Sequence, residues 1–126
     1  MFKFIALIKR KQGMSRQEFI DYYENHHAKL GPSMFPDIFA KCRLYRRNYL
    51  VFDDPFPSDA AYKDRQTTAG FDVVTECMFD TREEAEALFS AATRTPEKAK
   101  IIQADGERFV ENHAQMYIVE AHETNF

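Results

Sequence analysis

The stretch SRQEFIDYYENHHAKLGP, residues 15–32, predicts a helix with a defined start and a defined end. Ser15 and Glu18 have the spacing of a capping box, in which each side chain accepts a hydrogen bond from a free backbone N–H at the helix start. Gly31 and Pro32 predict the end, because glycine adopts a left-handed C-cap and proline cannot continue the helical ladder. The residues that recur at helical spacing form one broad and mainly aromatic face: Phe19, Tyr22, Tyr23, His26, His27 and Leu30.

Segments on both sides of this helix have the patterns of strands and further helices. Strands are predicted at residues 2–9, 41–52, 71–79 and 115–122, where β-branched, aromatic and alternating apolar residues gather. A capping box at Thr81 and Glu84 predicts a helix to about residue 92, and Thr95-Pro96 predicts a third that ends near residue 104. Residues 105–110 are expected to form a turn or a short helical piece. Residues 53–70, which contain prolines, are expected to form a partial lid.

The order of these elements predicts the fold class. Strand, helix, strand, strand, helices, strand is the split βαβ pattern of an α+β ferredoxin-like fold, here as one domain over residues 1–126. A four-stranded antiparallel sheet of this kind carries its helices on one face only. The strands place apolar side chains on both faces, so the second face needs a cover. A second copy of the sheet supplies it, which predicts a face-to-face homodimer with a barrel-like interior.

Composition excludes several classes of function. The formal net charge of this 126-residue chain is −3, which argues against nucleic acid as the main partner. No apolar run approaches transmembrane length, and the first ten residues are too interrupted by charge for a signal peptide. Cys42 and Cys77 lack metal-ligand spacing and are expected to be free, mostly buried thiols. Together these features predict a cytoplasmic protein that binds neither nucleic acid nor membrane.

The adjacent histidines are the leading candidates for chemistry. His27 suits proton exchange near neutral pH, and Tyr23, one turn before it, is placed to bond it or a phenolic substrate. The structural alternative is a histidine that caps the helix end. His26 and Tyr22 form a second pair, and the spacing does not decide which pair faces a pocket. Because adjacent residues on a helix diverge by about 100°, the two histidines are not expected to share a metal ion.

Other candidate residues are spread along the chain. Asp105 is expected to orient a histidine or to accept a proton, and the structural alternative is an N-cap for the turn before Phe109. Glu76 is expected to pair with Arg46 or Arg47 on the adjacent strand. The absence of a nucleophile elbow, a phosphate loop and a dinucleotide fingerprint favours acid–base chemistry without a bound cofactor. The residues predicted to contact substrate are Tyr22, Phe4, Tyr45, Arg47, Glu76 and Phe109.

Two motifs resemble a known family. Residues 7–19, LIKRKQGMSRQEF, followed by YYENHHA at 22–28, are similar to the opening of EthD-type proteins in the dimeric α+β barrel superfamily. ADGERF at 104–109 resembles the family's Asp-Glu-x-x-Phe element, with Gly106 where an acidic residue is usual. The resemblance implies a homodimer with a pocket between sheet and helices, and it implies a functional role for His27 and for His26.

The same resemblance implies several kinds of activity. Its members include cofactor-independent cyclases, isomerases, decarboxylases and monooxygenases of aromatic polyketide metabolism, and proteins that accompany ether-degrading cytochromes. The main hypothesis is therefore an enzyme acting on a hydrophobic aromatic or polyketide-like substrate, with His27, Tyr23, His26 and Asp105 as its catalytic residues. The alternatives are a non-catalytic protein that binds an apolar metabolite or haem, with His27 as an axial ligand, and a purely structural dimer module.

Overall fold

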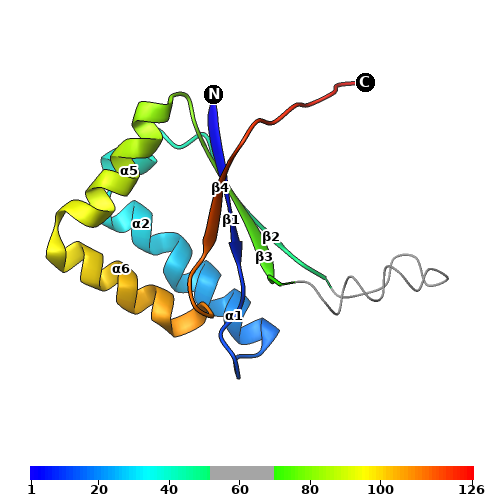
Figure 1. Cartoon of the computed structure of the whole chain (residues 1–126), viewed down its shortest axis with the longest axis vertical. Helices are drawn as coiled ribbons and strands as arrows, with labels where there is room; N and C mark the ends of the chain where they lie inside the picture. The colour runs from blue at the N-terminus through cyan, green and yellow to red at the C-terminus, as the bar shows by residue number, and fades with distance from the viewer. Residues whose placement is uncertain (52–69) are drawn as a thin grey trace.

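A computed structural model of the chain describes residues 1–51 and 70–126 (Figure 1). The strands pair antiparallel in the order β2-β3-β1-β4, with β1 at Phe2–Ile8, β2 at Leu44–Tyr49, β3 at Val73–Phe79 and β4 at Gln115–Val119. This arrangement is the α+β ferredoxin-like fold that the order of elements predicts. The lid predicted at residues 53–70 lies, apart from Gly70, outside the described residues.

The described helices lie on one side of this sheet, as the fold requires (Figure 1). They comprise α1 (Arg16–Tyr22), the π-helix η1 (Tyr23–His27), α2 (Ala28–Met34), α3 (Pro36–Phe39), α5 (Arg82–Arg94) and α6 (Pro96–Phe109). Both predicted capping boxes are present. The Ser15 side chain accepts from the Glu18 N–H, the Glu18 side chain accepts from the Ser15 N–H, and the Thr81–Glu84 pair repeats the arrangement.

The predicted end of the first helix at Gly31 and Pro32 is wrong. The helix continues through both residues to Met34. Gly31 allows the Phe39 ring to pack directly against the helix backbone, because a Cβ on Gly31 would lie 2.6 Å from that ring. Its small size therefore admits α3 beside α2, and no left-handed cap is formed.

The predicted break after residue 104 is also wrong. Helix α6 runs without interruption to Phe109, so Asp105 lies inside a helix and does not cap a turn. An interior glycine costs about 1 kcal/mol of helix stability relative to alanine, and Gly106 occupies such a position. The complete burial of Phe109 at the end of the same helix offsets that cost.

The core lies between the sheet and the helices and consists of two clusters. The first surrounds the fully buried rings of Phe19, Tyr23 and Phe109, and the second contains Phe4, Cys77, Phe79 and Ala85. The side chains of β1 and β3 alternate between buried and half-buried, as expected for strands with one face against helices. The histidine-bearing helix packs over the first cluster.

The opposite face of the sheet carries a charged group around Glu76. The Glu76 carboxylate lies 2.6 Å from the Lys3 ammonium and 2.6 Å from Arg46 Nε, which confirms the predicted pair with Arg46. Asn48 donates a further hydrogen bond to it. The hydrogen bonds from Arg46 and Lys3 lower the pKa of Glu76 from 4.5 to about 2.

Glu76→Gln is expected to make the stability of the protein less sensitive to acid. Because the pKa of Glu76 is lower in the folded protein, its stabilisation is fully present above pH 4.5 and is lost as the pH falls toward 2. Urea denaturation across this range should therefore show a shallower decline for Glu76→Gln than for the wild type. Glu83→Gln, a change at an exposed glutamate, should keep the wild-type slope. Identical slopes for the wild type and Glu76→Gln would contradict the argument.

Candidate active site

A π-turn shapes the aromatic face of the first helix. Within η1 the N–H of Ala28 bonds to the carbonyl of Tyr23, five residues before it. Residues five apart on a regular α-helix point about 140° away from each other. The wider π-turn brings residues five apart toward the same side of the helix, so Tyr22 and His27 both reach the same partner on α6.

That partner is the carboxylate of Asp105, which is 8% exposed. The Tyr22 hydroxyl donates to Asp105 Oδ1 at 2.8 Å, and His27 Nδ1 lies 2.5 Å from Oδ2. Both carboxylate oxygens thus contact side chains of the first helix, Tyr22 in α1 and His27 in η1, which lie 83 and 78 residues earlier in the chain. The predicted contact between Asp105 and a histidine is present, and the histidine is His27.

The His27 ring is held by aromatic neighbours. Tyr23 meets it edge-on at 4.8 Å between ring centroids, and Phe109 lies at the same distance. The Tyr23 hydroxyl points elsewhere, to Thr75 Oγ1 at 2.5 Å on β3, so Tyr23 contacts His27 through its ring and forms no hydrogen bond with it. With 31% of its side chain exposed, His27 remains accessible to a small molecule.

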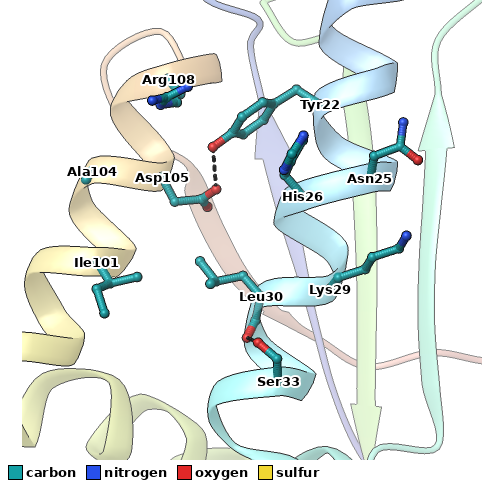
Figure 2. Close-up of a pocket in the computed structure, with 10 residues that line it drawn as sticks. All are labelled: Tyr22, Asn25, His26, Lys29, Leu30, Ser33, Ile101, Ala104, Asp105 and Arg108. Atoms are coloured by element: carbon teal, nitrogen blue, oxygen red, sulfur yellow. Dashed lines mark hydrogen bonds between the residues drawn. The ribbon is translucent and has the colours of Figure 1, made fainter.

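His26 lies in a different setting, on the outer side of the helix layer. Its ring stacks on the Tyr22 ring, with 5.1 Å between centroids. His26 also borders a cleft of about 410 Å³ that lies between α1, η1 and α2 on one side and α6 on the other (Figure 2). Figure 2 shows Tyr22 pointing across this cleft to Asp105, and Leu30 facing Ile101. The cleft is lined by Tyr22, Asn25, His26, Lys29, Leu30, Ser33, Ile101, Ala104, Asp105 and Arg108. Asp105 therefore connects this cleft to His27.

The position of Tyr22 holds its phenol in the neutral form. Partial burial and the hydrogen bond to the Asp105 carboxylate raise the pKa of Tyr22 to about 12. A phenol that keeps its proton remains a hydrogen-bond donor over the whole physiological range. Tyr22 thus steadies the Asp105 carboxylate while the other oxygen faces His27.

Arg47 belongs to an ion-pair network beside this site. It donates two hydrogen bonds to the Glu24 carboxylate, which also accepts from the Tyr49 hydroxyl. Its guanidinium lies 4.8 Å from the Tyr45 ring centroid. The hydrogen bonds from Arg47 lower the pKa of Glu24, and burial raises the pKa values of Tyr45 and Tyr49. The half-buried arginine therefore has its required partner, which is Glu24 and not Glu76.

The structure does not bring all the predicted site residues together. His27, Tyr22, Tyr23, Asp105 and Phe109 form one contact group. Phe4 lies in the second core cluster and packs against Phe89, while Glu76 lies on the opposite sheet face. Glu76 does not join the His27 group because the alternation of a strand sends neighbouring side chains to opposite faces. Phe4 faces the helices but belongs to the other core cluster, which contains no residue of the His27 group.

Two residues of the site were not predicted as site residues from the sequence. Thr75 bonds the Tyr23 hydroxyl, and Glu24 holds Arg47 and Tyr49. Thr75 carried a signal, since it is a polar residue among apolar ones on the inner face of its strand. No such signal marks Glu24 in the sequence, because an acidic residue in a helix ordinarily faces solvent.

The arrangement suits proton transfer. A carboxylate that accepts the Nδ1–H of a histidine fixes the neutral tautomer whose Nε2 bears a lone pair, so the ring acts as a base and, once protonated, as an acid. Across residues 1–51 and 70–126, no group of three or more histidines, cysteines or acidic residues is placed to hold a metal ion. In the same part of the chain, no helix is long and apolar enough to cross a membrane.

Comparison with known structures shows the same fold in several proteins. An ethyl tert-butyl ether d (EthD) family protein from Bacillus halodurans C-125 matches with a TM-score of 0.58 at 21% identity, over 97% of this chain and all of the other. A hydroxynitrile lyase from Passiflora edulis matches with 0.51 at 18% identity, over 98% and 96%. A dimeric ferredoxin-like protein of unknown function from Bacteroides fragilis matches with 0.50 at 15%, over 92% and 93%.

A comparison with curated proteins finds no match. The EthD domain, in contrast, matches residues 11–113. This span contains the π-turn, the strands β2 and β3 and the helix that carries Asp105. The match covers most of the chain, and the fold agrees with that of an EthD family protein. The chain therefore belongs to the EthD family.

Proposed function

We propose that the protein is a cofactor-independent acid–base enzyme in which His27 exchanges a proton with the substrate and Asp105 orients His27. The observation that carries this proposal is the 2.5 Å contact between His27 Nδ1 and the buried Asp105 carboxylate. Among the described residues, Nδ1 is the His27 ring nitrogen with a hydrogen-bond partner. Nε2 is then the nitrogen that meets the substrate.

The substrate that fits this site is a hydrophobic aromatic or polyketide-like ketone or phenol. The rings of Tyr23 and Phe109 that flank the histidine are fully buried, so a ligand would meet the exposed edge of His27 and the half-buried ring of Tyr22 on the cleft. Aromatic rings of this kind favour stacked or edge-on contacts with an aromatic ligand. The reaction is proton abstraction beside a carbonyl, followed by cyclisation, isomerisation, dehydration or decarboxylation. Cleavage of a hydroxynitrile needs the same kind of base, because removal of the hydroxyl proton forms the carbonyl as the bond to the nitrile carbon breaks, and the cyanide that leaves takes up a proton.

We propose further that the working form is a homodimer joined through the open sheet face. That face carries the half-buried apolar side chains of Ile5, Leu7 and Val74 around the Glu76 group, and Tyr117 on β4 is 52% exposed. A sheet face of this composition is usually covered in the functional protein. The Bacteroides fragilis protein of the same fold is described as dimeric, which is consistent with this arrangement.

A proton-exchange screen tests the proposed reaction. Aryl ketones, hydroxylated aromatic compounds and hydroxynitriles are incubated with the protein in D₂O, and loss of substrate proton signals is followed by NMR. The wild type should accelerate exchange or cleavage for at least one class, and His27→Gln should abolish the acceleration. His26→Gln is the matched control, since it alters the adjacent histidine without touching the contact to Asp105. Equal rates for wild type and His27→Gln would refute the mechanism, and ligand shifts without turnover would favour a binding protein.

A further inference from the structure

The two cysteines lie 35 residues apart in the sequence but next to each other in the fold. Cys42 Sγ and Cys77 Sγ are 3.6 Å apart, and neither is in a disulfide. Cys77 lies in the middle of β3, faces the helices and is 4% exposed. Cys42 precedes β2, outside any strand or helix, and is half-buried. The pair is therefore one thiol inside a strand paired on both sides and one thiol on a segment without strand pairing at that residue.

The two thiols differ in their access to solvent. Cys42 lines an open groove of about 410 Å³ beside α3, together with the mainly apolar residues Pro32, Pro36, Phe39, Leu44 and Tyr45. Cys77 lies behind Cys42 in the second core cluster, where Phe4, Phe79 and Ala85 surround it. A small molecule that enters the groove meets the Cys42 sulfur first.

The contact between the sulfurs also makes them chemically unequal. A hydrogen bond from the Cys77 thiol lowers the pKa of Cys42, while the pKa of Cys77 is raised by the same contact and by burial. Since the thiolate is the nucleophile, Cys42 is the more reactive of the two. Access and ionisation therefore both single out Cys42 as the attacking thiol.

We propose that Cys42 and Cys77 form a peroxide-reactive dithiol site, with Cys42 as the attacking thiol and Cys77 as the resolving thiol. The substrate class is a hydroperoxide small enough to enter the groove beside α3. This site is separate from the His27–Asp105 contact group and does not depend on the function proposed for that group.

The reaction is a two-electron oxidation of the dithiol. The Cys42 thiolate attacks one peroxide oxygen, the O–O bond breaks, and the leaving alkoxide or hydroxide takes up a proton to give an alcohol or water. Cys42 then carries a sulfenic acid. The Cys77 sulfur attacks the Cys42 sulfur, the S–O bond breaks, and the released hydroxide leaves as water with the Cys77 proton. The products are one disulfide, one alcohol or water from the peroxide, and one further water.

Formation of this disulfide needs a modest movement. The sulfurs must approach by about 1.5 Å to reach the length of an S–S bond. Cys77 is fixed, because β3 is paired with β1 on one side and with β2 on the other. The approach therefore falls to Cys42, whose segment has no strand pairing at that residue.

Peptide mapping after treatment with hydrogen peroxide tests the proposal. The reduced wild type should lose both thiols and gain a Cys42–Cys77 bond within one chain, and dithiothreitol should reverse the change. Cys77→Ala should stop at a Cys42 sulfenic acid that dimedone captures. Cys42→Ala should lower the rate of thiol oxidation by at least about tenfold, because the remaining thiol is buried and protonated. Alanine is the replacement because both sites are apolar.

Three results would overturn the proposal: a disulfide that joins two chains, equal oxidation rates for Cys42→Ala and the wild type, or two thiols that stay intact under peroxide. Circular dichroism checks that each variant is folded. If a variant fails this check, competitive alkylation of the folded wild type by iodoacetamide decides the matter. Cys42 should then be labelled at least about tenfold faster than Cys77, and equal labelling would refute the assignment.

Discussion

Replacing Asp105 with asparagine should lower turnover of an identified substrate by about 10²–10⁴-fold, the usual contribution of a positioned acid or base. The buried carboxylate accepts one hydrogen bond from the Tyr22 hydroxyl and faces His27 Nδ1. An asparagine in its place offers an N–H to one of these groups. If that N–H faces His27, the ring adopts the other tautomer and Nε2 no longer carries a free lone pair. Steady-state kinetics measures the loss, which should fall on kcat more than on KM.

Two controls separate this effect from general damage to the fold. Tyr22→Phe removes the other donor to Asp105 but leaves the contact to His27, so its effect on kcat should be far smaller. Asp37→Asn, at an exposed residue of α3, should leave kcat unchanged. The histidine ring nitrogens report the tautomer directly by NMR, and Asp105→Asn should change the signals of His27 only. An unchanged kcat in Asp105→Asn would exclude Asp105 from the mechanism.

The sequence predicted the fold well because the fold depends on local signals. The capping boxes at Ser15 and Thr81 mark helix starts through contacts only three residues long, and both form as predicted. The strands show their alternation directly, and the order of elements along the chain predicted the split βαβ fold. The error at Gly31 has a tertiary cause, because a glycine is a good stop signal only where no packed side chain needs its small size, and here Phe39 does. The error after residue 104 arose because α6 continues to Phe109, whose ring is buried in the core.

The sequence predicted which residues form the site, but it did not predict most of the contacts between them. His27, Tyr22 and Asp105 were all candidates, yet regular helical spacing paired Tyr22 with His26. The π-turn at η1 changes that spacing, and nothing in the residues 23–27 distinguishes it from α-helix. The contact with Asp105 spans 78 residues, so it depends on how the two helices lie across the sheet. Tertiary contacts of this kind become visible only in the folded chain.

Phe109→Ala should lower the free energy of unfolding by about 3–5 kcal/mol, the range for truncating a buried aromatic ring. Phe109 is fully buried, and its ring lies 5.7 Å from Phe19, 5.5 Å from Tyr23 and 4.8 Å from His27, centroid to centroid. The cavity would lie inside the first core cluster, where the surrounding rings are large and cannot easily close it. Urea denaturation at one fixed protein concentration measures the loss, because association with a partner would alter apparent stability.

A matched substitution shows whether position or chemistry causes this loss. Phe89→Ala removes the same ring from α5, where Phe89 is 40% exposed and packs against Phe4 at one side only. Its cost should be about 1 kcal/mol, in proportion to the smaller apolar area withdrawn from water. Phe109→Leu should fall between the two, since leucine fills part of the cavity. If Phe109→Ala costs no more than Phe89→Ala, then Phe109 faces a ligand pocket rather than the core, and its role is contact with substrate. A large cost makes Phe109 a support for the His27 ring, and substrate contact then falls to the exposed edge of that histidine.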